Sequence, residues 1–495
     1  MIHKKYLLLS VILFINKSEC LDSVAIHVDD QLATEQEQYK AIEYRKPKAK
    51  HDKQNSFNAT APGQLDRTFG TDGRVTTTSF NGVLTGIAIR QTTPDDYEIV
   101  TTGFAFSTLT YMPLVTYNID GNKIAKIDFS STTPPTTGAA IAIDSLNRIV
   151  IGGEVKRALG TTNSSFMARR YRNPTTVDST FGTAIASYGA SATNSFKTTS
   201  IAIDNQNRVL LGGSVLPSNQ ERWKLVRFYD NGQLDSTFGG SNATNRGFSD
   251  SVYGSRINGI ALQENGDIFV AGSADIITQG SLQVRFSVGR YTANGILVWS
   301  TVTDFTPLGL VNKSARANAV ALQKDGKIVA VGTTATNATG TGQAFVLARY
   351  NPDGTLDTTF GSGGLQVAPF NSAISEATAV AIDDNGFIIV AGYTTPTGSS
   401  HQSFAVAAFN PDGSLNSEFG TNGLVVTAFG NNQNVVASSV AIEPISKRII
   451  VGGTITQDTT NHFALACYNG LLKKQAPLPV ARFSSNGILD PRFGK

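Results

Sequence analysis

Charged side chains recur at a fixed spacing in this chain: an arginine is followed eight residues later by an aspartate. The pairs are Arg170 and Asp178, Arg227 and Asp235, Arg349 and Asp357, and Arg482 and Asp490. Where the arginine is lost the aspartate is lost as well, as at Ala408 and Asn416, and Arg290, which stands opposite Val298, departs from the rule. Guanidinium and carboxylate groups form charge-assisted hydrogen bonds. Because the arginine and the aspartate are lost together, we predict that they contact each other. We interpret them as structural pairs rather than as a ligand-binding ring of charges.

Residues for a catalytic or metal-binding site are scarce. After residue 62 the chain has two histidines, His401 and His462. A Ser-His-Asp triad and a multi-histidine metal site are therefore poorly supported. The run Asp-Asp-Asn-Gly at 383–386 lacks the spaced carboxylates and terminal glutamate of a calcium loop, so it indicates a turn. If an N-terminal signal is removed, Cys467 is the one remaining cysteine and no internal disulfide can form. We expect neither a metal ion nor a cofactor.

A long repeat must position these residues. Its marker is an apolar triplet with alanine in the middle, which occurs seven times. The copies are Ile87-Ala88-Ile89, Ile141-Ala142-Ile143, Ile201-Ala202-Ile203, Ile260-Ala261-Leu262, Val320-Ala321-Leu322, Val380-Ala381-Ile382 and Val440-Ala441-Ile442. Successive copies start 54, 60, 59, 60, 60 and 60 residues apart. A period this constant is typical of repeat architectures.

Each repeat indicates four short strands, A to D, and the fifth copy shows them clearly. Strand A holds the triplet, an Asx-Gly dipeptide at 325–326 predicts a two-residue hairpin turn, and strand B follows as KIVAVG. Strand C is FVLARY at 345–350, and strand D, from residue 364, comes after the phrase LDTTFG. Seven such units predict an all-β fold, a seven-bladed β-propeller of about sixty-residue, four-stranded blades.

The phrases DGKIVAVG at 325–332 and RYNPDGTLDTTFG at 349–361 resemble those of the delta-60 repeat family of bacterial β-propeller proteins. The resemblance covers about residues 63–495. It implies a propeller and export, and it offers no catalytic residues. Copies one and four, with YNIDGNKIAKID at 117–128 and YTANGILVWST at 291–301, lack the LDxxFG phrase. We expect their C-to-D corners to be irregular.

The two ends of the repeat region complement each other. The seventh copy has strands A, B and C but no strand D before the chain ends, whereas an LDxxFG phrase and the strand GRVTTTSF at 73–80 precede the first strand A. We therefore predict that the N-terminal strand pairs into the last blade and closes the ring. Such closure removes sheet edges that would otherwise invite aggregation.

Residues 1–20 have the features of a signal peptide. Two lysines precede an apolar run at 6–15, and Ser18 and Cys20 supply small residues before a cleavage site. A lipid anchor on Cys20 is the rival interpretation, which Lys17 disfavours. After cleavage we expect no transmembrane segment, and a protein that is secreted, periplasmic or at the cell surface.

Between this signal and the repeats, residues 21–62 are dense in charge and indicate a linker that is partly helical or disordered. The remaining domain is the propeller, at 63–495. The net charge is +3 without a dense lysine or arginine tract in the repeats, so we expect no nucleic-acid partner. We expect a monomer.

Function is expected in the connections that vary. The A–B and C–D turns share one face of a propeller, and the variable B–C and D–A loops share the other, where binding usually sits. Tyr253, Arg256 and His401 are the candidate binding residues, for an unknown protein or glycan. Two alternatives stay open: a polysaccharide hydrolase or lyase using carboxylates at the central channel, and a structural surface protein without a specific ligand. We favour binding over catalysis.

Overall fold

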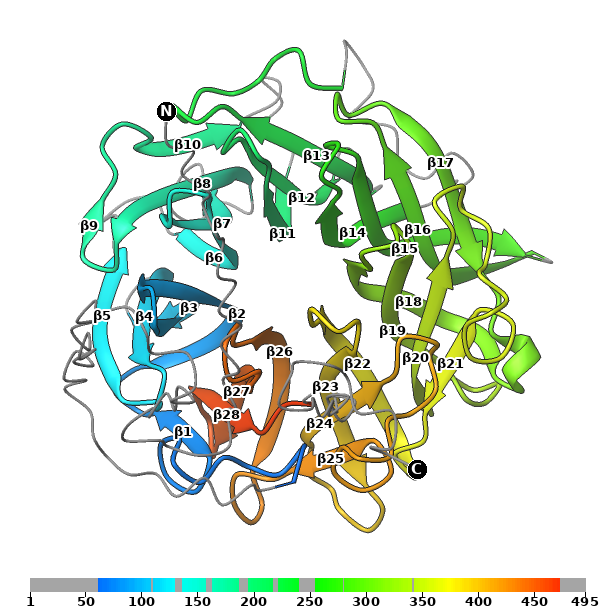
Figure 1. Ribbon diagram of the computed structural model, residues 1–495. Coiled ribbons are helices and arrows are strands. Elements are labelled where there is room, and N and C mark those ends of the chain that lie inside the picture. Colours follow the sequence, from blue (N-terminus) through cyan, green and yellow to red (C-terminus); the bar gives the residue numbers. More distant parts are fainter. Residues whose placement is uncertain are drawn as a thin grey trace, which may run out of the picture. The chain divides into compact units, whose positions relative to one another are not determined.

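Strands dominate the computed structural model, which describes residues 61–107, 110–129, 136–156, 163–186, 195–216, 221–239, 254–278, 280–340 and 342–471 (Figure 1). These residues lie in one compact unit, Ala59–Lys495. Its described part contains a single 3-10 turn, Thr306–Leu308, beside the strands. The expected signal and most of the expected linker fall outside the described residues.

Hydrogen bonding sorts the described strands into six sheets, and one parallel bridge, between Gln343 and Ile374, joins two groups of strands into the largest sheet. We therefore distinguish seven strand groups. Group one is β2 (Asn81–Thr93), β3 (Asp96–Phe106), β4 (Thr110–Asn118) and β5 (Lys123–Phe129). Group two is β6 (Thr136–Ile143), β7 (Ile149–Lys156), β8 (Ser164–Asn173), β9 (Thr176–Val177) and β10 (Thr183–Ala186). Group three is β11 (Ser195–Ile203), β12 (Val209–Leu216) and β13 (Arg222–Phe228).

The other groups continue in chain order. Group four is β14 (Gly254–Leu262), β15 (Ile268–Thr278), β16 (Ser281–Tyr291) and β17 (Leu297–Thr303). Group five is β18 (Val311–Leu322), β19 (Ile328–Ala335), β20 (Gln343–Tyr350) and β21 (Leu365–Ala368). Group six is β22 (Ser372–Ile382), β23 (Ile388–Pro396), β24 (Ser403–Phe409) and β25 (Leu424–Thr427). Group seven is β26 (Asn434–Ile442), β27 (Ile449–Gln457) and β28 (Thr460–Tyr468), with β1 (Arg74–Thr77) at its edge.

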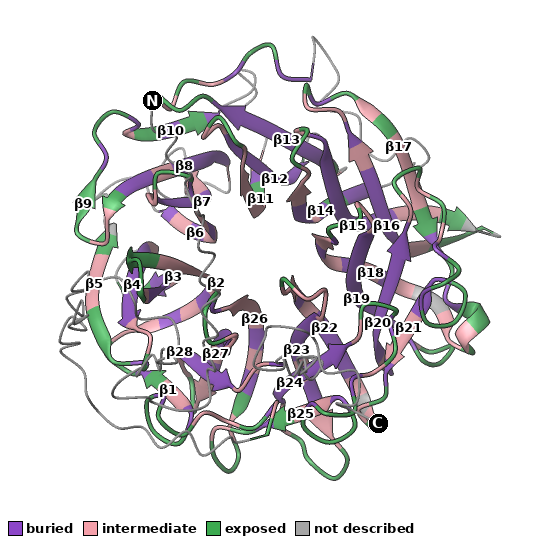
Figure 2. Cartoon of the chain, viewed as in Figure 1, coloured by how far each residue is buried: buried purple, intermediate pink, exposed green. Residues whose placement is uncertain are grey.

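The core lies between neighbouring groups. The middle strands are buried on both faces, as in β19, where every residue is buried, and this explains why they are nearly continuous runs of apolar and small residues. One core cluster joins Val331 of group five to Val390 of group six, and another joins Leu84 of group one to Ile450 of group seven. Figure 2 shows this burial along the middle strands, with exposure at the outer strands and turns.

At the Asx-Gly A–B turns the expected two-residue hairpin is wrong. Gln323 N–H donates to the Lys327 carbonyl and Gly326 N–H donates to Gln323, so the loop holds three residues, 324–326. Gly326 takes φ +82°, while Asp325 stays at negative φ. This is the geometry of a three-residue loop that needs glycine at its left-handed position.

A belt of hydrogen bonds joins the first strands of neighbouring groups, which face the centre in Figure 1. The donor is a Thr, Asn or Ser side chain two residues before the triplet, and the acceptor is a backbone carbonyl three residues before the next triplet. The bonds are Thr85 to Gly138, Thr199 to Ile257, Asn258 to Ala317, Asn318 to Ala377, Thr378 to Ala437 and Ser438 to Leu84. In group two the donor position holds Ala139, which has no polar side chain.

The strand expected from residues 73–80 is β1, and it pairs with β28, with Val75 opposite Leu465. Its approach follows the other corners. The Asp66 N–H donates to the Cys467 carbonyl at 2.9 Å, as the Asp235 N–H donates to the Arg227 carbonyl at 2.9 Å in group three. The N-terminal phrase therefore occupies the corner of group seven. Groups one and four differ at this corner, because β5 and β17 follow a short turn directly.

Candidate functional site

The three described Arg–Asp pairs form ion pairs inside their groups. Arg170 Nε lies 2.9 Å from Asp178, Arg227 Nη2 lies 2.7 Å from Asp235, and Arg349 Nη2 lies 2.8 Å from Asp357. All six side chains are buried. Arg482 and Asp490 lie outside the described residues. Arg290, the exception in the sequence, pairs instead with Asp267 at 2.6 Å.

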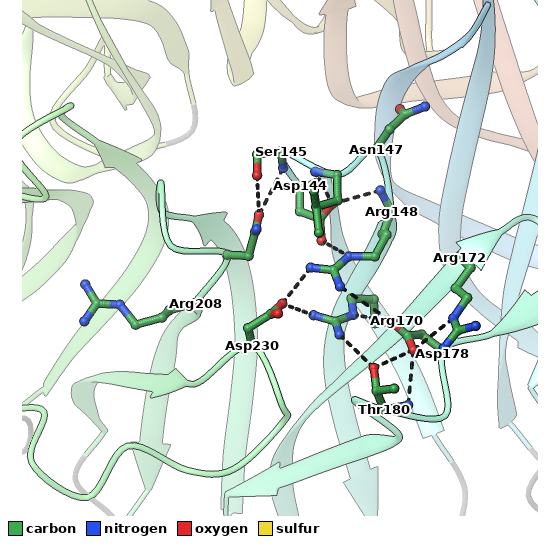
Figure 3. A network of polar contacts seen from close by, with 12 residues as sticks. Asp144, Ser145, Asn147, Arg148, Arg170, Arg172, Asp178, Thr180, Arg208 and Asp230 are labelled. Atoms are coloured by element: carbon green, nitrogen blue, oxygen red, sulfur yellow. Dashed lines mark hydrogen bonds and ion pairs between the residues drawn. The ribbon is translucent and has the colours of Figure 1, made fainter.

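The same arginines also reach the next group. Figure 3 shows Arg148 and Arg170 of group two meeting the Asp230 carboxylate of group three. Arg227 donates to the Ala293 carbonyl of group four at 2.6 Å, and Arg349 donates to the Pro411 carbonyl of group six. Because these contacts link the corner of one group to the next, we interpret the network as a structural brace between groups rather than as a binding site.

These pairs predict an unequal response to arginine removal. Burial opposes ionisation of Asp235, but hydrogen bonds from Thr237, Arg227 and Tyr229 lower the pKa of Asp235 to about 2. Arg227→Ala leaves that buried carboxylate without its cation, which costs about 3–5 kcal/mol. Arg349→Ala should cost less, because Lys327 also pairs with Asp357, at 2.5 Å.

Urea unfolding of both variants at pH 7 checks this order. Asp235 has a lowered pKa in the folded state, so its contribution is full above the ordinary carboxyl pKa and is lost as pH falls toward about 2. The gap between wild type and Arg227→Ala should therefore close over that acid range. An equal cost for the two variants would count against the brace.

Polar and charged residues gather at the opposite end of the first strands, at a single register. The position four residues before each triplet pairs with the end of the second strand in every group. The pairs are Val83 with Phe104, Thr137 with Glu154, Lys197 with Ser214, Arg256 with Ser273, Arg316 with Thr333, Glu376 with Tyr393, and Val436 with Thr454. We call these fourteen residues the loop-end layer, because the B–C and D–A connections begin there.

A glycine fixes the backbone of this layer. A Cβ on Gly272 of β15 would lie 1.8 Å from the Arg256 carbonyl oxygen, so no other residue fits there without moving β14. Beside that contact the β14–β15 register shifts between Ile257 and Gly259. Equivalent glycines, with Cβ positions 1.8–2.1 Å from the matching carbonyl, are Gly103, Gly153, Gly213, Gly332, Gly392 and Gly453.

One cluster of the layer joins groups three and four. Arg256 Nε donates to one oxygen of the Glu221 carboxylate, and the Ser214 hydroxyl donates to the other. Both charges act on Asp275 of β15. Burial raises the pKa of Asp275, the Arg256 charge lowers this pKa in part, and the Glu221 charge raises it further. The Asp275 Oδ1 atom is buried and has no hydrogen-bond partner among the residues that the structure describes.

A second cluster joins groups five and six around a buried carboxylate. Glu376 accepts from Arg316 Nη2 at 2.6 Å, from Asn318 at 2.9 Å and from the Tyr393 hydroxyl at 2.8 Å. Burial and the Glu376 charge raise the pKa of Tyr393 well above its usual value. Each Glu376 oxygen accepts a hydrogen bond, so this cluster is a structural link between the two groups.

Group two adds a third carboxylate, Glu154, which accepts from the Thr198 N–H of group three at 3.0 Å. Burial raises the pKa of Glu154, and Lys156 and Lys197 oppose the rise. Lys197 itself is exposed. The layer thus carries donors and acceptors around groups two to six. Group one is apolar at this register, with Val83 and Phe104, and group seven has Val436 opposite Thr454.

The two described residues among those predicted for binding belong to different groups. Arg256 lies in the loop-end layer, Tyr253 falls outside the described residues, and His401 precedes β24 with its Nδ1 3.1 Å from the Ser400 hydroxyl. His462 Nδ1 instead lies 3.2 Å from the Phe80 carbonyl. Glu221, Asp275 and Glu376 were not predicted from the sequence. A signal existed for Glu376, which shares the offset of Arg256 from its triplet.

Other features of the described residues add no second site. They hold no cluster of three metal-ligating side chains, and none of their helices is long and apolar enough to cross a membrane. A cavity of about 10 Å³ near Arg227 and Asp204 has room for about one water molecule. The Cys467 thiol is free and buried, and burial raises its pKa.

A sequence match to a protein family identifies the fold. A family model described as "Domain of unknown function (DUF5122) beta-propeller" matches residues 207–238, 323–360 and 384–419. The chain is a β-propeller. The matched segments span second strands, third strands and C-to-D corners, which are the phrases that the sequence repeats. The match supports the resemblance of the repeats to a bacterial β-propeller repeat family. No curated protein matches the chain in sequence.

Solved structures resemble this propeller at low sequence identity. A polysaccharide lyase of family PL25, an ulvan lyase, is 11% identical with a TM-score of 0.47, over 80% of this chain and 96% of its own. The α-L-arabinanase of Penicillium chrysogenum is 9% identical with a TM-score of 0.42, over 68% and 98%. A Dyadobacter fermentans protein of unknown function is 11% identical with a TM-score of 0.41, over 68% and 95%.

Proposed function

We propose that this β-propeller is an exported binding scaffold that closes as a seven-bladed ring and binds a glycan at its loop-end layer. Export rests on the signal-like residues 1–20. Each strand group is then one blade of the ring.

Two observations support closure. The Ser438 hydroxyl of group seven donates to the Leu84 carbonyl of group one at 2.8 Å, as Thr378 donates to Ala437 at 2.8 Å between groups six and seven. In addition, β1 adds a fourth strand to group seven from the start of the propeller. The last group therefore meets the first through the contacts that join consecutive groups.

The composition of the loop-end layer carries the proposal of a glycan ligand. At this register Arg256 stands where groups seven and one have Val436 and Val83, and 45% of its side chain is exposed. Sugar hydroxyls both donate and accept hydrogen bonds, and polar side chains held on strands offer both kinds of partner at fixed positions. At the opposite end, the corresponding charged groups are already paired in the Arg–Asp brace.

Glycan and protein arrays probed with residues 21–495 test the proposal. We expect glycan binding that Arg256→Ala weakens and that Lys324→Ala preserves, since Lys324 lies in the A–B turn at the other end and donates to the Asp384 carbonyl at 2.8 Å. Binding to proteins but to no glycan would indicate that the ligand is a protein. Absence of binding to either array would refute the scaffold function.

Glycan cleavage is the second candidate, favoured by one observation. Asp275 has a raised pKa and lies beside the Glu221 carboxylate, and carboxyl groups with different environments are the usual acid–base residues of glycoside hydrolysis. Reducing ends or unsaturated products released from an array-positive glycan, and lost in Asp275→Asn, would favour the enzyme. Binding without any product would favour the scaffold.

A further inference from the structure

We propose that Arg256 and Asp275 form a subsite for two neighbouring hydroxyl groups of an uncharged sugar residue. This inference rests on the proposed glycan binding and narrows it to a ligand class. It concerns the junction of groups three and four, where Glu221 and Ser214 complete the cluster.

Strand register places both side chains together. Arg256 pairs with Ser273, and Gly254 pairs with Asp275, so the four residues alternate by two along β14 and β15 and share one face of the sheet. Diagonal neighbours of this kind lie within reach of long side chains. The electrostatic influence of Arg256 on Asp275 is consistent with that placement.

The two side chains have complementary unused hydrogen-bonding capacity. Within the described part of the chain, the Asp275 Oδ1 atom is buried without a hydrogen-bond partner, which is costly for a polar group. The Arg256 side chain is 45% exposed, and the hydrogen bond from Nε to Glu221 leaves its terminal nitrogens as donors. A hydroxyl that donates to Asp275, beside one that accepts from Arg256, would satisfy both.

The charges of the cluster disfavour an anionic ligand group here. Glu221 and Asp275 are both carboxyl groups, and Glu221 already neutralises Arg256. A ligand carboxylate or sulfate would therefore meet one compensated cation and two acidic side chains. Uncharged hydroxyls avoid this repulsion and supply the proton that an acceptor needs.

Gly254 leaves space for the Asp275 carboxyl group. A Cβ at this position would lie 2.5 Å from Asp275 Oδ2, so a side chain at residue 254 would occupy the space beside the carboxyl group. Gly254→Ala should push Asp275 aside, and thus disturb the subsite without removing any of its polar groups.

The test measures both binding and stability in residues 21–495, with uncharged and uronate-containing oligosaccharides as the probes. Asp275→Ala should weaken binding of an uncharged glycan about 10- to 100-fold, the usual effect of losing a hydrogen bond to a charged group. Its melting temperature should rise, because an unpaired buried acceptor is removed. A residue with a purely structural role would show the reverse, a lower melting temperature and unchanged affinity.

Further variants and the effect of salt also test the subsite. Arg256→Gln and Gly254→Ala should weaken the same binding, Lys324→Ala should not, and added salt should have little effect. Exclusive binding of uronate glycans with steep salt dependence would overturn this subsite and leave the scaffold function standing. Uncharged glycans bound equally by wild type and Asp275→Ala would also overturn the subsite alone. Failure of the wild type to bind any glycan would overturn both.

Discussion

Deletion of residues 63–80 should lower the melting temperature of the mature protein sharply, whereas deletion of residues 21–60 should leave it unchanged. The first deletion removes β1 and its four-residue ladder with β28, together with the bridge from Leu65 to Tyr468. It also removes Phe69, which is fully buried in the cluster between groups seven and one. Loss of a buried phenylalanine alone costs roughly 3–5 kcal/mol.

Thermal melts of the two truncations, followed by circular dichroism, measure this difference. The control ends at residue 60 because the Pro62 carbonyl accepts from the Gly420 N–H and the Ala61 carbonyl accepts from Gln64. Phe69→Ala in the full mature chain should reproduce a large part of the loss. Equal melting temperatures for the two truncations would contradict ring closure through β1.

The features of the fold that were predictable from the sequence are those that depend on local residues. The period of the triplet predicts the repeat, and the Asx-Gly dipeptides predict where strands reverse. The turn length was wrong because glycine at φ +82° and an aspartate at negative φ form a three-residue loop, as at Asp325-Gly326. Both loop types use the same dipeptide, so composition alone could not separate them.

The candidate site was less predictable because its contacts cross between groups. Arg256 was chosen as a residue of a variable loop, but it lies in β14, and its partner Glu221 comes from the preceding group. Thirty-five residues separate the two in sequence, and no repeated phrase contains Glu221. By contrast, Arg227 and Asp235 lie within one repeat, and their joint presence was therefore visible.

Gly272→Ala should both destabilise the protein and weaken glycan binding. The new Cβ would lie 1.8 Å from the Arg256 carbonyl oxygen, a backbone atom that cannot rotate away. Relief requires β14 to move, and overpacking of this kind costs roughly 1–3 kcal/mol or more. Because Arg256 moves with its own carbonyl, the subsite is displaced as well.

Gly103→Ala is the matched control, since its Cβ would lie 1.9 Å from the Val83 carbonyl oxygen in group one. The same backbone clash then falls where the loop-end layer is apolar. Both variants should melt at similarly lowered temperatures, measured by circular dichroism, but at a temperature where both are folded only Gly272→Ala should bind glycan more weakly. Equal loss of binding in the two variants would mean that general destabilisation, rather than displacement of Arg256, explains the effect. Unchanged stability in both would show that the strand-B glycines do not fix the layer.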